Sequence, residues 1–311
     1  MPIQKIIFIL LVALLGFFGL SPEKLYDVVT RYERYSAGLE KKSITLDFGE
    51  VFYSENDVQS AVTLVLIHGF GGGKDTWNRV ADRWDDEYHI IAIDLPGHAE
   101  SVSKKDLGFT ITQQAQRVKQ FIDAKNIKGF YLLGHSMGGA ITLRYAADHT
   151  QNVRALILID SMGMEKTKSD GVILVEHSDT NPLYDVCTKE RLETLLNYSM
   201  HEPPYIPDII KEALLKEKCA RREIEKEIYN GMYQDVNLSH AAQSIDVPTL
   251  IVWGEKDRMT HVDDATLFHH TISNSQLVIL KEIGHVPILE APEKTAEVIS
   301  RFIEHTEQIH Q

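Results

Sequence analysis

Apolar residues gather in short unbroken runs that alternate along the chain with segments of helical periodicity. The runs are rich in β-branched residues, which is typical of strands buried on both faces of a parallel sheet. They occupy residues 62–70, 88–97, 130–136, 153–160, 248–257 and 275–285. Helical patterns follow at 74–84, 110–124, 137–149 and 292–305. The alternation predicts βαβ units and an α/β fold, with a mostly parallel central sheet flanked by helices.

One long interval between two of these strands departs from the alternation. Residues 161–247 contain helical stretches at 189–200, 207–216 and 221–233, and a structureless loop of this length is improbable in a compact domain. We therefore predict a helical cap inserted over the sheet. We expect residues 1–22 to form a hydrophobic signal anchor and residues 23–42 a linker helix. Residues 43–160 and 248–311 are expected to form the two parts of the core, and residues 161–247 the cap. A hairpin of two strands, 42–48 and 50–56, opens the core.

The N-terminus is the most apolar part of the chain. Lys5 precedes fifteen uncharged, mostly large apolar residues, 6–20, and Ser21-Pro22 follows them. No small-x-small cleavage site is present, so we expect an uncleaved signal anchor; a cleaved signal peptide and a buried core helix are the alternatives. Lys5 and the terminal amine favour an orientation with the rest of the chain on the non-cytoplasmic side, in a periplasm or lumen, or secreted if the segment is cleaved.

Composition excludes several classes of protein. The 311 residues carry a net charge of −13, which argues against a broad basic surface for nucleic acid. The two cysteines, Cys187 and Cys219, form no CxxC motif, so neither a zinc knuckle nor a disulfide scaffold is indicated. They are either buried thiols or, in an oxidising compartment, a disulfide pair.

Candidate chemistry lies in the sequence Gly134-His135-Ser136-Met137-Gly138, between a strand and a helix. A sharp strand-to-helix turn holds the serine hydroxyl above the carboxyl edge of the sheet, and the glycines give room for close backbone approach. The helix N-terminus below it favours developing negative charge. The pattern therefore predicts Ser136 as a nucleophile.

A serine hydroxyl needs a base, and the sequence offers one in the expected order. Asp257 and His285 each follow a late strand, so both face the same sheet edge as Ser136. His285 would take the proton of Ser136, and Asp257 would orient the imidazole. Glu255 and Asp160 are the alternative carboxylates.

Two backbone N–H groups complete the predicted site as an oxyanion hole, one from Met137 and one from Phe70 in the glycine-rich turn 68–74. That turn lacks the spacing of a phosphate-binding loop. His98 is expected to organise its loop and His135 to pack or hydrogen-bond locally. The adjacent histidines His269 and His270 do not share a helix face, so we predict no metal site there, and no cofactor.

Five motifs together resemble the α/β-hydrolase superfamily: LIHGFGG, IDLPGHAES, GHSMGG, WGEKD and IGHVP, within residues 43–305. The chain is most similar to the membrane-anchored monoacylglycerol lipases and a related group of small bacterial lipases and esterases. The resemblance implies an α/β-hydrolase fold, carboxylic ester hydrolysis on acyl glycerols, a triad of Ser136, Asp257 and His285, and oxyanion donors Phe70 and Met137. Ala99 departs from the family pattern, where many relatives have glycine.

Two other functions compete with ester hydrolysis. Carbon–carbon bond hydrolases of aromatic ring-cleavage products share the serine triad and the cap, although the apolar N-terminus disfavours them. Non-catalytic binding proteins on this fold usually lack a triad member, whereas this chain lacks none. The expected partners are an acyl ester or monoacylglycerol substrate and a membrane, with no nucleic acid.

Overall fold

The computed structural model describes residues 19–84, 86–104, 107–164, 169–176, 178 and 180–309. The expected anchor lies almost entirely outside these residues, so its prediction stands untested. Of the helices in the described ranges, none is both long and apolar enough to cross a bilayer.

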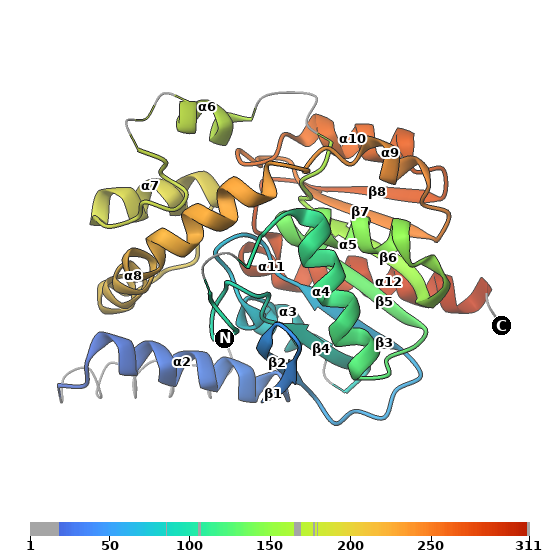
Figure 1. The fold of residues 1–311 in the computed structure, drawn as a ribbon, viewed down its shortest axis with the longest axis horizontal. Coiled ribbons are helices and arrows are strands. Elements are labelled where there is room, and N and C mark those ends of the chain that lie inside the picture. Colours follow the sequence, from blue (N-terminus) through green and yellow to red (C-terminus); the bar gives the residue numbers. More distant parts are fainter. Residues whose placement is uncertain are drawn as a thin grey trace.

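The described residues form one eight-stranded sheet with the order β1-β2-β4-β3-β5-β6-β7-β8 (Figure 1). The antiparallel hairpin β1–β2 joins the sheet through β4, and the neighbours from β4 to β8 are parallel. The strands are β1 Glu40–Leu46, β2 Gly49–Glu55, β3 Thr63–Ile67, β4 His89–Ile93, β5 Phe130–His135, β6 Val153–Ile159, β7 Thr249–Gly254 and β8 Ser275–Leu280. The predicted α/β class, mostly parallel sheet and opening hairpin are confirmed.

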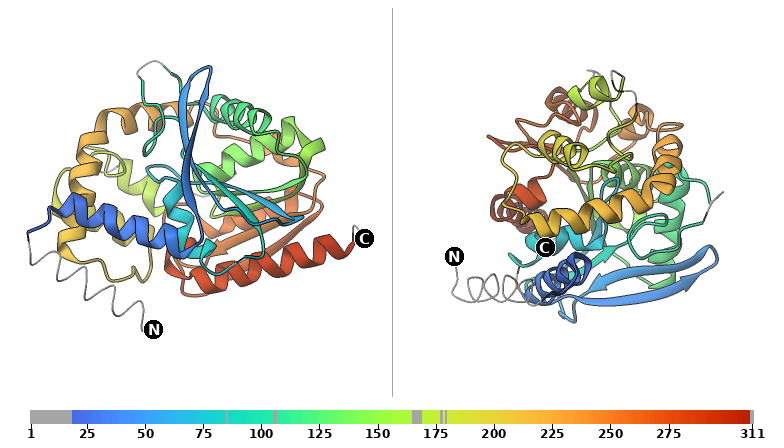
Figure 2. Two further views of the ribbon diagram at one scale, coloured as in Figure 1. Left: turned by 90° about the horizontal axis from the view of Figure 1, so that it is seen from below. Right: turned by 90° about the vertical axis from the view of Figure 1, so that its left-hand side faces the viewer.

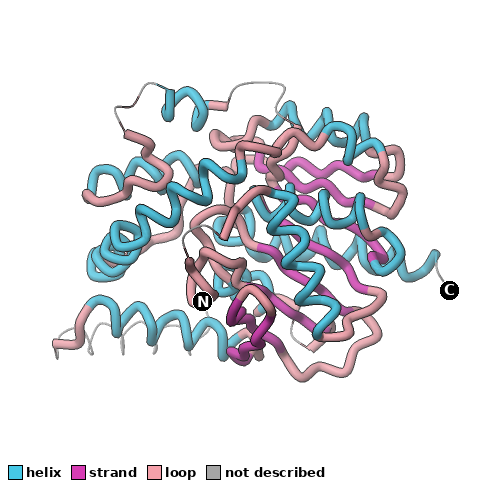
Figure 3. The backbone as a smooth tube through the Cα atoms, in the orientation of Figure 1, coloured by secondary structure: helices cyan, strands magenta, loops and turns pink. Residues whose placement is uncertain are grey.

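Helices cover both faces of the sheet, as the alternation of runs predicts (Figure 3). The core on one face packs against α4, α5, α9 and α10, and the core on the other face packs against α3, α11 and α12. The helices are α2 Pro22–Ser36, η1 Lys74–Trp77, α3 Asn78–Ala81, α4 Ile111–Ala124, α5 Met137–Asp148, η2 Thr150–Asn152, α6 Asp170–Glu176, α7 Lys189–Ser199, α8 Asp208–Met232, α9 Ser239–Gln243, α10 Val262–Thr271, α11 Pro287–Glu290 and α12 Pro292–Ile309.

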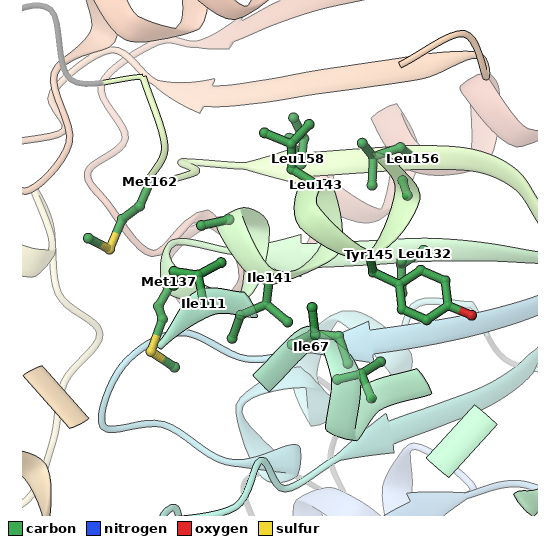
Figure 4. Packing of buried hydrophobic residues seen from close by; sticks show 14 of the residues in the cluster. Ile67, Ile111, Leu132, Met137, Ile141, Leu143, Tyr145, Leu156, Leu158 and Met162 are labelled. Atoms are coloured by element: carbon green, nitrogen blue, oxygen red, sulfur yellow. The ribbon is translucent and has the colours of Figure 1, made fainter. Parts of the chain in front are cut away.

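Buried strand residues explain why the central runs read as continuously apolar. Every residue of β5 and β7 is buried, because helices cover both faces there. Figure 4 shows Met137 among core residues that include Ile67 and Ile141. The Met137 side chain is 1% exposed and belongs to this core, so only its backbone, and not its side chain, is available to the substrate cavity.

The cap region differs in detail from the sequence prediction. Residues 207–216 and 221–233 were expected as two helices, but α8 runs continuously from Asp208 to Met232. No proline or glycine interrupts residues 208–230, so nothing forces a break between the two periodic stretches. The helix α2 lies beside α8, below the cap in Figure 1 and next to it in both views of Figure 2. It ends at Ser36 rather than at residue 42, since β1 begins at Glu40.

Cys187 and Cys219, left open by the sequence, form a disulfide. The bond joins the segment before α7 to the middle of α8 and closes a loop with a sequence separation of 32 residues. The disulfide therefore links two segments of the cap covalently.

Candidate active site

Ser136 lies at the sharp turn between β5 and α5. Its backbone has φ 54°, a left-handed conformation that costs an L-residue energy and is held here by the surrounding structure. A Cβ at Gly134 would overlap the Gly138 carbonyl, and one at Gly138 would overlap the carbonyls of Ile67 and His68. The glycines that flank the serine are thus required by close backbone approach, as the sequence pattern suggested.

The structure brings the three predicted triad residues together. The Ser136 hydroxyl lies 2.9 Å from Nε2 of His285, and Nδ1 of His285 lies 2.8 Å from Oδ2 of Asp257. All three residues are buried, with exposures of 7%, 6% and 7% in the order Ser136, His285, Asp257. This is the hydrogen-bonded order in which histidine accepts the serine proton and the carboxylate accepts from the other ring nitrogen.

Asp257 is held as an anion by a set of donors that the sequence did not reveal. Its Oδ1 accepts from the N–H groups of Met259 and Thr260 at 2.7 and 3.0 Å, and its Oδ2 accepts from the Thr260 hydroxyl at 2.6 Å. Burial by itself would raise the pKa of Asp257, but the charge of His285 and the side-chain hydrogen bonds from His285 and Thr260 together lower it. Thr260 carries no recognisable sequence signal.

The alternative carboxylates occupy different positions. Glu255 is partly exposed and accepts from the Glu282 N–H at 3.2 Å, away from the His285 ring. Asp160 is fully buried and lies next to Asp257 and His285, with one side-chain atom of each within 4.8 Å of the others. Within the described part of the chain, the imidazole's carboxylate partner is Asp257 and not Asp160, so Asp257 holds the orienting position.

The two expected oxyanion donors lie next to the nucleophile. Phe70 lines the same cavity as Ser136, and Met137 begins α5 directly after it. A Cβ at Gly69 would come within 3.1 Å of Ser136 Cβ, which measures how closely the turn approaches the serine. Among the described residues, no backbone hydrogen bond occupies the N–H of Phe70 or Met137, so both are free to bind a substrate oxygen.

A cavity of about 1670 Å³ opens over Ser136 and His285. The cap helices contribute much of its apolar wall, and α2 contributes Tyr26 and Val29. This volume exceeds the roughly 300–1,000 Å³ of an ordinary small-molecule site, so there is room for a long acyl chain.

Comparison with known proteins identifies the family. Residues 62–184 match the family model described as the alpha/beta hydrolase fold. Lipase 3 of Moraxella sp. (strain TA144) is 33% identical over 279 residues, which cover 88% of this chain and 88% of that lipase. The chain belongs to the α/β-hydrolase family. The predicted family, fold and resemblance are confirmed.

Other members of the family support the class of reaction. A solved structure described as a membrane phospholipase A is 32% identical, with a TM-score of 0.89 and coverage of 98% of each chain. Monoacylglycerol lipase ABHD6 of Homo sapiens is 25% identical over 309 residues, covering 94% of this chain and 90% of that protein. The hydrolase is a carboxylic ester hydrolase, as predicted.

Hydrogen bonds connect the cap helix α8 to the glycine-rich turn 68–74 and to the loop at residues 97–99. From α8, Lys218 Nζ donates to the Gly71 carbonyl at 3.3 Å and pairs with the buried Glu225 at 3.1 Å, while Arg221 donates to the carbonyls of Gly97 and Ala99. Ala99 has φ 42°, a conformation that glycine adopts without cost. The alanine that departs from the family pattern is therefore strained, and the backbone still adopts the turn that glycine would favour.

His135 and His269 each form a hydrogen bond outside the triad. His135 Nε2–H donates to the backbone carbonyl of His285 at 2.7 Å, so His135 supports the loop that carries the base. That partner is distant in sequence, unlike the local one expected. Nδ1 of His269 lies 2.9 Å from the Ser275 hydroxyl, an ordinary surface hydrogen bond next to His270.

Three buried neutral histidines near the site predict acid sensitivity of the fold. Burial lowers the pKa of His68 to about 4 and of His135 to about 3, and it lowers that of His98 well below its usual value. The unfolded chain titrates these groups near about 6.5, so it binds more protons than the folded protein below that pH. We expect the free energy of unfolding to be fully retained above pH ~6.5 and to fall as the pH drops toward 4.5.

Thermal melts followed by circular dichroism between pH 8 and 4.5 would measure this effect. Ordinary carboxylates titrate below this window, near pH ~4. Asp94, Asp160 and Glu225, whose pKa burial raises, act in the opposite direction inside it, so they reduce the fall in stability that the three histidines cause. A melting temperature that stays constant from pH 7 to 4.5 would contradict the prediction.

Proposed function

We propose that this hydrolase cleaves acyl esters of glycerol, with monoacylglycerols as the preferred class, through an acyl-enzyme on Ser136. The observation that carries the proposal is the hydrogen-bonded chain Ser136–His285–Asp257, of which Ser136 and His285 line the cavity. The similarity to named lipases and monoacylglycerol lipases supports the acyl glycerol class.

The proposed mechanism moves one proton back and forth. Ser136 Oγ attacks the ester carbonyl while its proton passes to His285 Nε2, and the N–H groups of Phe70 and Met137 hold the oxyanion. Collapse breaks the C–O bond, and the imidazolium returns the proton to the leaving glycerol. Water then repeats the sequence on the acyl-enzyme, which releases the fatty acid and restores the serine.

The cavity is suited to an acyl chain. Leu183, Leu196, Ile210, Leu214 and Met232 from the cap lie along it, and burial of each chain methylene there contributes about 0.8 kcal/mol. We expect a chain of medium to long length to bind better than acetate or butyrate esters.

An ester panel tests the substrate class. We expect turnover of p-nitrophenyl esters and of monoacylglycerols, with kcat/KM rising with acyl length until the cavity is filled. Hydrolysis confined to ring-cleavage dienes, with no ester turnover, would refute the proposal in favour of a carbon–carbon bond hydrolase. Well-folded protein that neither turns over esters nor reacts with a fluorophosphonate would instead indicate a binding protein.

A second candidate substrate is the acyl ester of a phospholipid. It is favoured by the 32% identity, over 98% of both chains, to the structure described as a membrane phospholipase A. A lysophospholipid and a monoacylglycerol with the same acyl chain separate the two candidates, because only the headgroup differs.

We also propose that the enzyme is anchored in a membrane with its catalytic domain on the non-cytoplasmic side. The apolar run 6–20 and the Cys187–Cys219 disulfide support this placement, since disulfides persist in oxidising compartments. N-terminal sequencing of the mature protein and protease protection in intact cells test it. A protein protected in cells and reduced at both cysteines would contradict it.

A further inference from the structure

The carboxyl group of Asp160 connects two central strands directly beneath the site. Asp160 follows β6 and is fully buried, and its N–H donates to the Val252 carbonyl of β7 at 3.0 Å. Its Oδ1 accepts from the Gly254 N–H at 2.8 Å. Its backbone has φ 44°, a left-handed conformation that aspartate and asparagine tolerate better than most residues. The hydrogen bonds to Val252 and Gly254 thus fix the position of Asp160 against β7.

The other carboxyl oxygen of Asp160 lacks a donor. Among the described residues, Oδ2 of Asp160 is buried and no N–H or O–H group donates to it. The carboxyl groups of Asp160 and Asp257 nevertheless lie close together, with one oxygen of each within 4.8 Å of the other and of a His285 ring nitrogen. An oxygen in such a place forms a hydrogen bond with a second carboxylate only if it carries a proton of its own.

The two carboxyl groups differ in the number of hydrogen-bond donors that surround them. Asp257 accepts four hydrogen bonds, from two N–H groups, the Thr260 hydroxyl and His285, whereas Asp160 accepts one. Burial, then repulsion by Asp257, raises the pKa of Asp160 well above its usual value, and Glu290 is the other charge that acts on it in this direction. The Gly254 N–H opposes this shift, and among the described residues it is the one hydrogen bond to the Asp160 carboxyl group that does so.

We propose that Asp160 is a positioning residue that keeps its proton and donates a hydrogen bond from Oδ2 to the carboxylate of Asp257. It fixes the Asp257 rotamer without adding a second negative charge next to the imidazole. The inference rests on the proposed catalytic triad, in which Asp257 orients His285. It explains why an acidic residue is buried at the end of β6 although it does not hold the base.

The test compares Asp160→Asn with Asp160→Ala in the full-length enzyme. Asparagine keeps both hydrogen bonds, since its Oδ1 accepts from Gly254 and its Nδ2 donates to Asp257, and it also suits the left-handed backbone. Alanine removes the donor. Sites are titrated with a fluorophosphonate, so that kcat refers to folded enzyme, and kcat and KM for a p-nitrophenyl ester are measured from pH 4.5 to 9.

We expect Asp160→Asn to retain at least about a third of kcat with the acidic limb of kcat/KM at its wild-type pH. Asp160→Ala is expected to lower kcat per titrated site by about 10-fold to 100-fold, with KM changed less than about twofold, because the geometry of the base is disturbed rather than substrate binding. The rescue by asparagine distinguishes this role from simple packing.

Two results would overturn the inference. If Asp160 were ionised it would favour the imidazolium, so Asp160→Asn would move the acidic limb to lower pH by about one unit or more. Wild-type kcat per titrated site in Asp160→Ala would show that no donor is needed. If the alanine variant does not fold, the pH profile of the asparagine variant still decides. Failure of the proposed function is seen separately, as absent ester turnover in the wild type or unchanged turnover in Ser136→Ala.

Discussion

Ser136→Ala is expected to abolish ester turnover, with kcat reduced by on the order of a millionfold. The variant lacks the oxygen that forms the acyl-enzyme, and no neighbouring group replaces it, since the Nε2 of His285 has Ser136 Oγ as its described partner at 2.9 Å. The fold should be retained, because the hydroxyl is small and its removal frees space on the cavity side.

Fluorophosphonate labelling provides a direct measurement of this nucleophile. The wild-type protein should be labelled with one equivalent, and Ser136→Ala should not be labelled at all. Ser244→Ala is a suitable control, because the Ser244 hydroxyl donates to the Ala241 carbonyl at 2.8 Å in the α9 turn, outside the cavity. Labelling that persists in Ser136→Ala would assign the nucleophile to another residue.

Asp257→Asn is expected to lower kcat by about 10⁴-fold while the protein stays folded. The two N–H groups of Met259 and Thr260 select the carbonyl oxygen of the new amide for the Oδ1 position. The NH₂ group then faces the Nδ1 of His285, so this nitrogen must become an acceptor. The ring proton moves to Nε2 and points at Ser136, which leaves the serine without a base.

Glu255→Gln is the matched control for this variant. Glu255 lies two residues before Asp257 and its carboxylate accepts from the Glu282 N–H, so the amide should retain nearly wild-type kcat. A large loss of activity in Glu255→Gln together with a nearly silent Asp257→Asn would show that the carboxylate is wrongly assigned. Melting temperatures of both variants separate loss of chemistry from loss of fold.

The sequence alone was sufficient for the fold class and for the three residues of the candidate site. Continuously apolar runs predict parallel strands covered on both faces, and a residue directly after such a strand must lie at the carboxyl edge of the sheet. Ser136, Asp257 and His285 each stand at such a position, so their convergence follows from topology. Local chemistry also marks the turn at Ser136, because glycines on both sides signal close backbone approach.

Contacts between segments distant in the sequence depend on the tertiary structure. The continuity of α8, the pairing of Cys187 with Cys219 and the hydrogen bond from His135 to the His285 carbonyl have no local signal. The protonation of Asp160 is decided in the same way. In the sequence, Asp160 and Asp257 both follow strands, and only the number of donors that the folded chain directs at each determines which of them carries the charge.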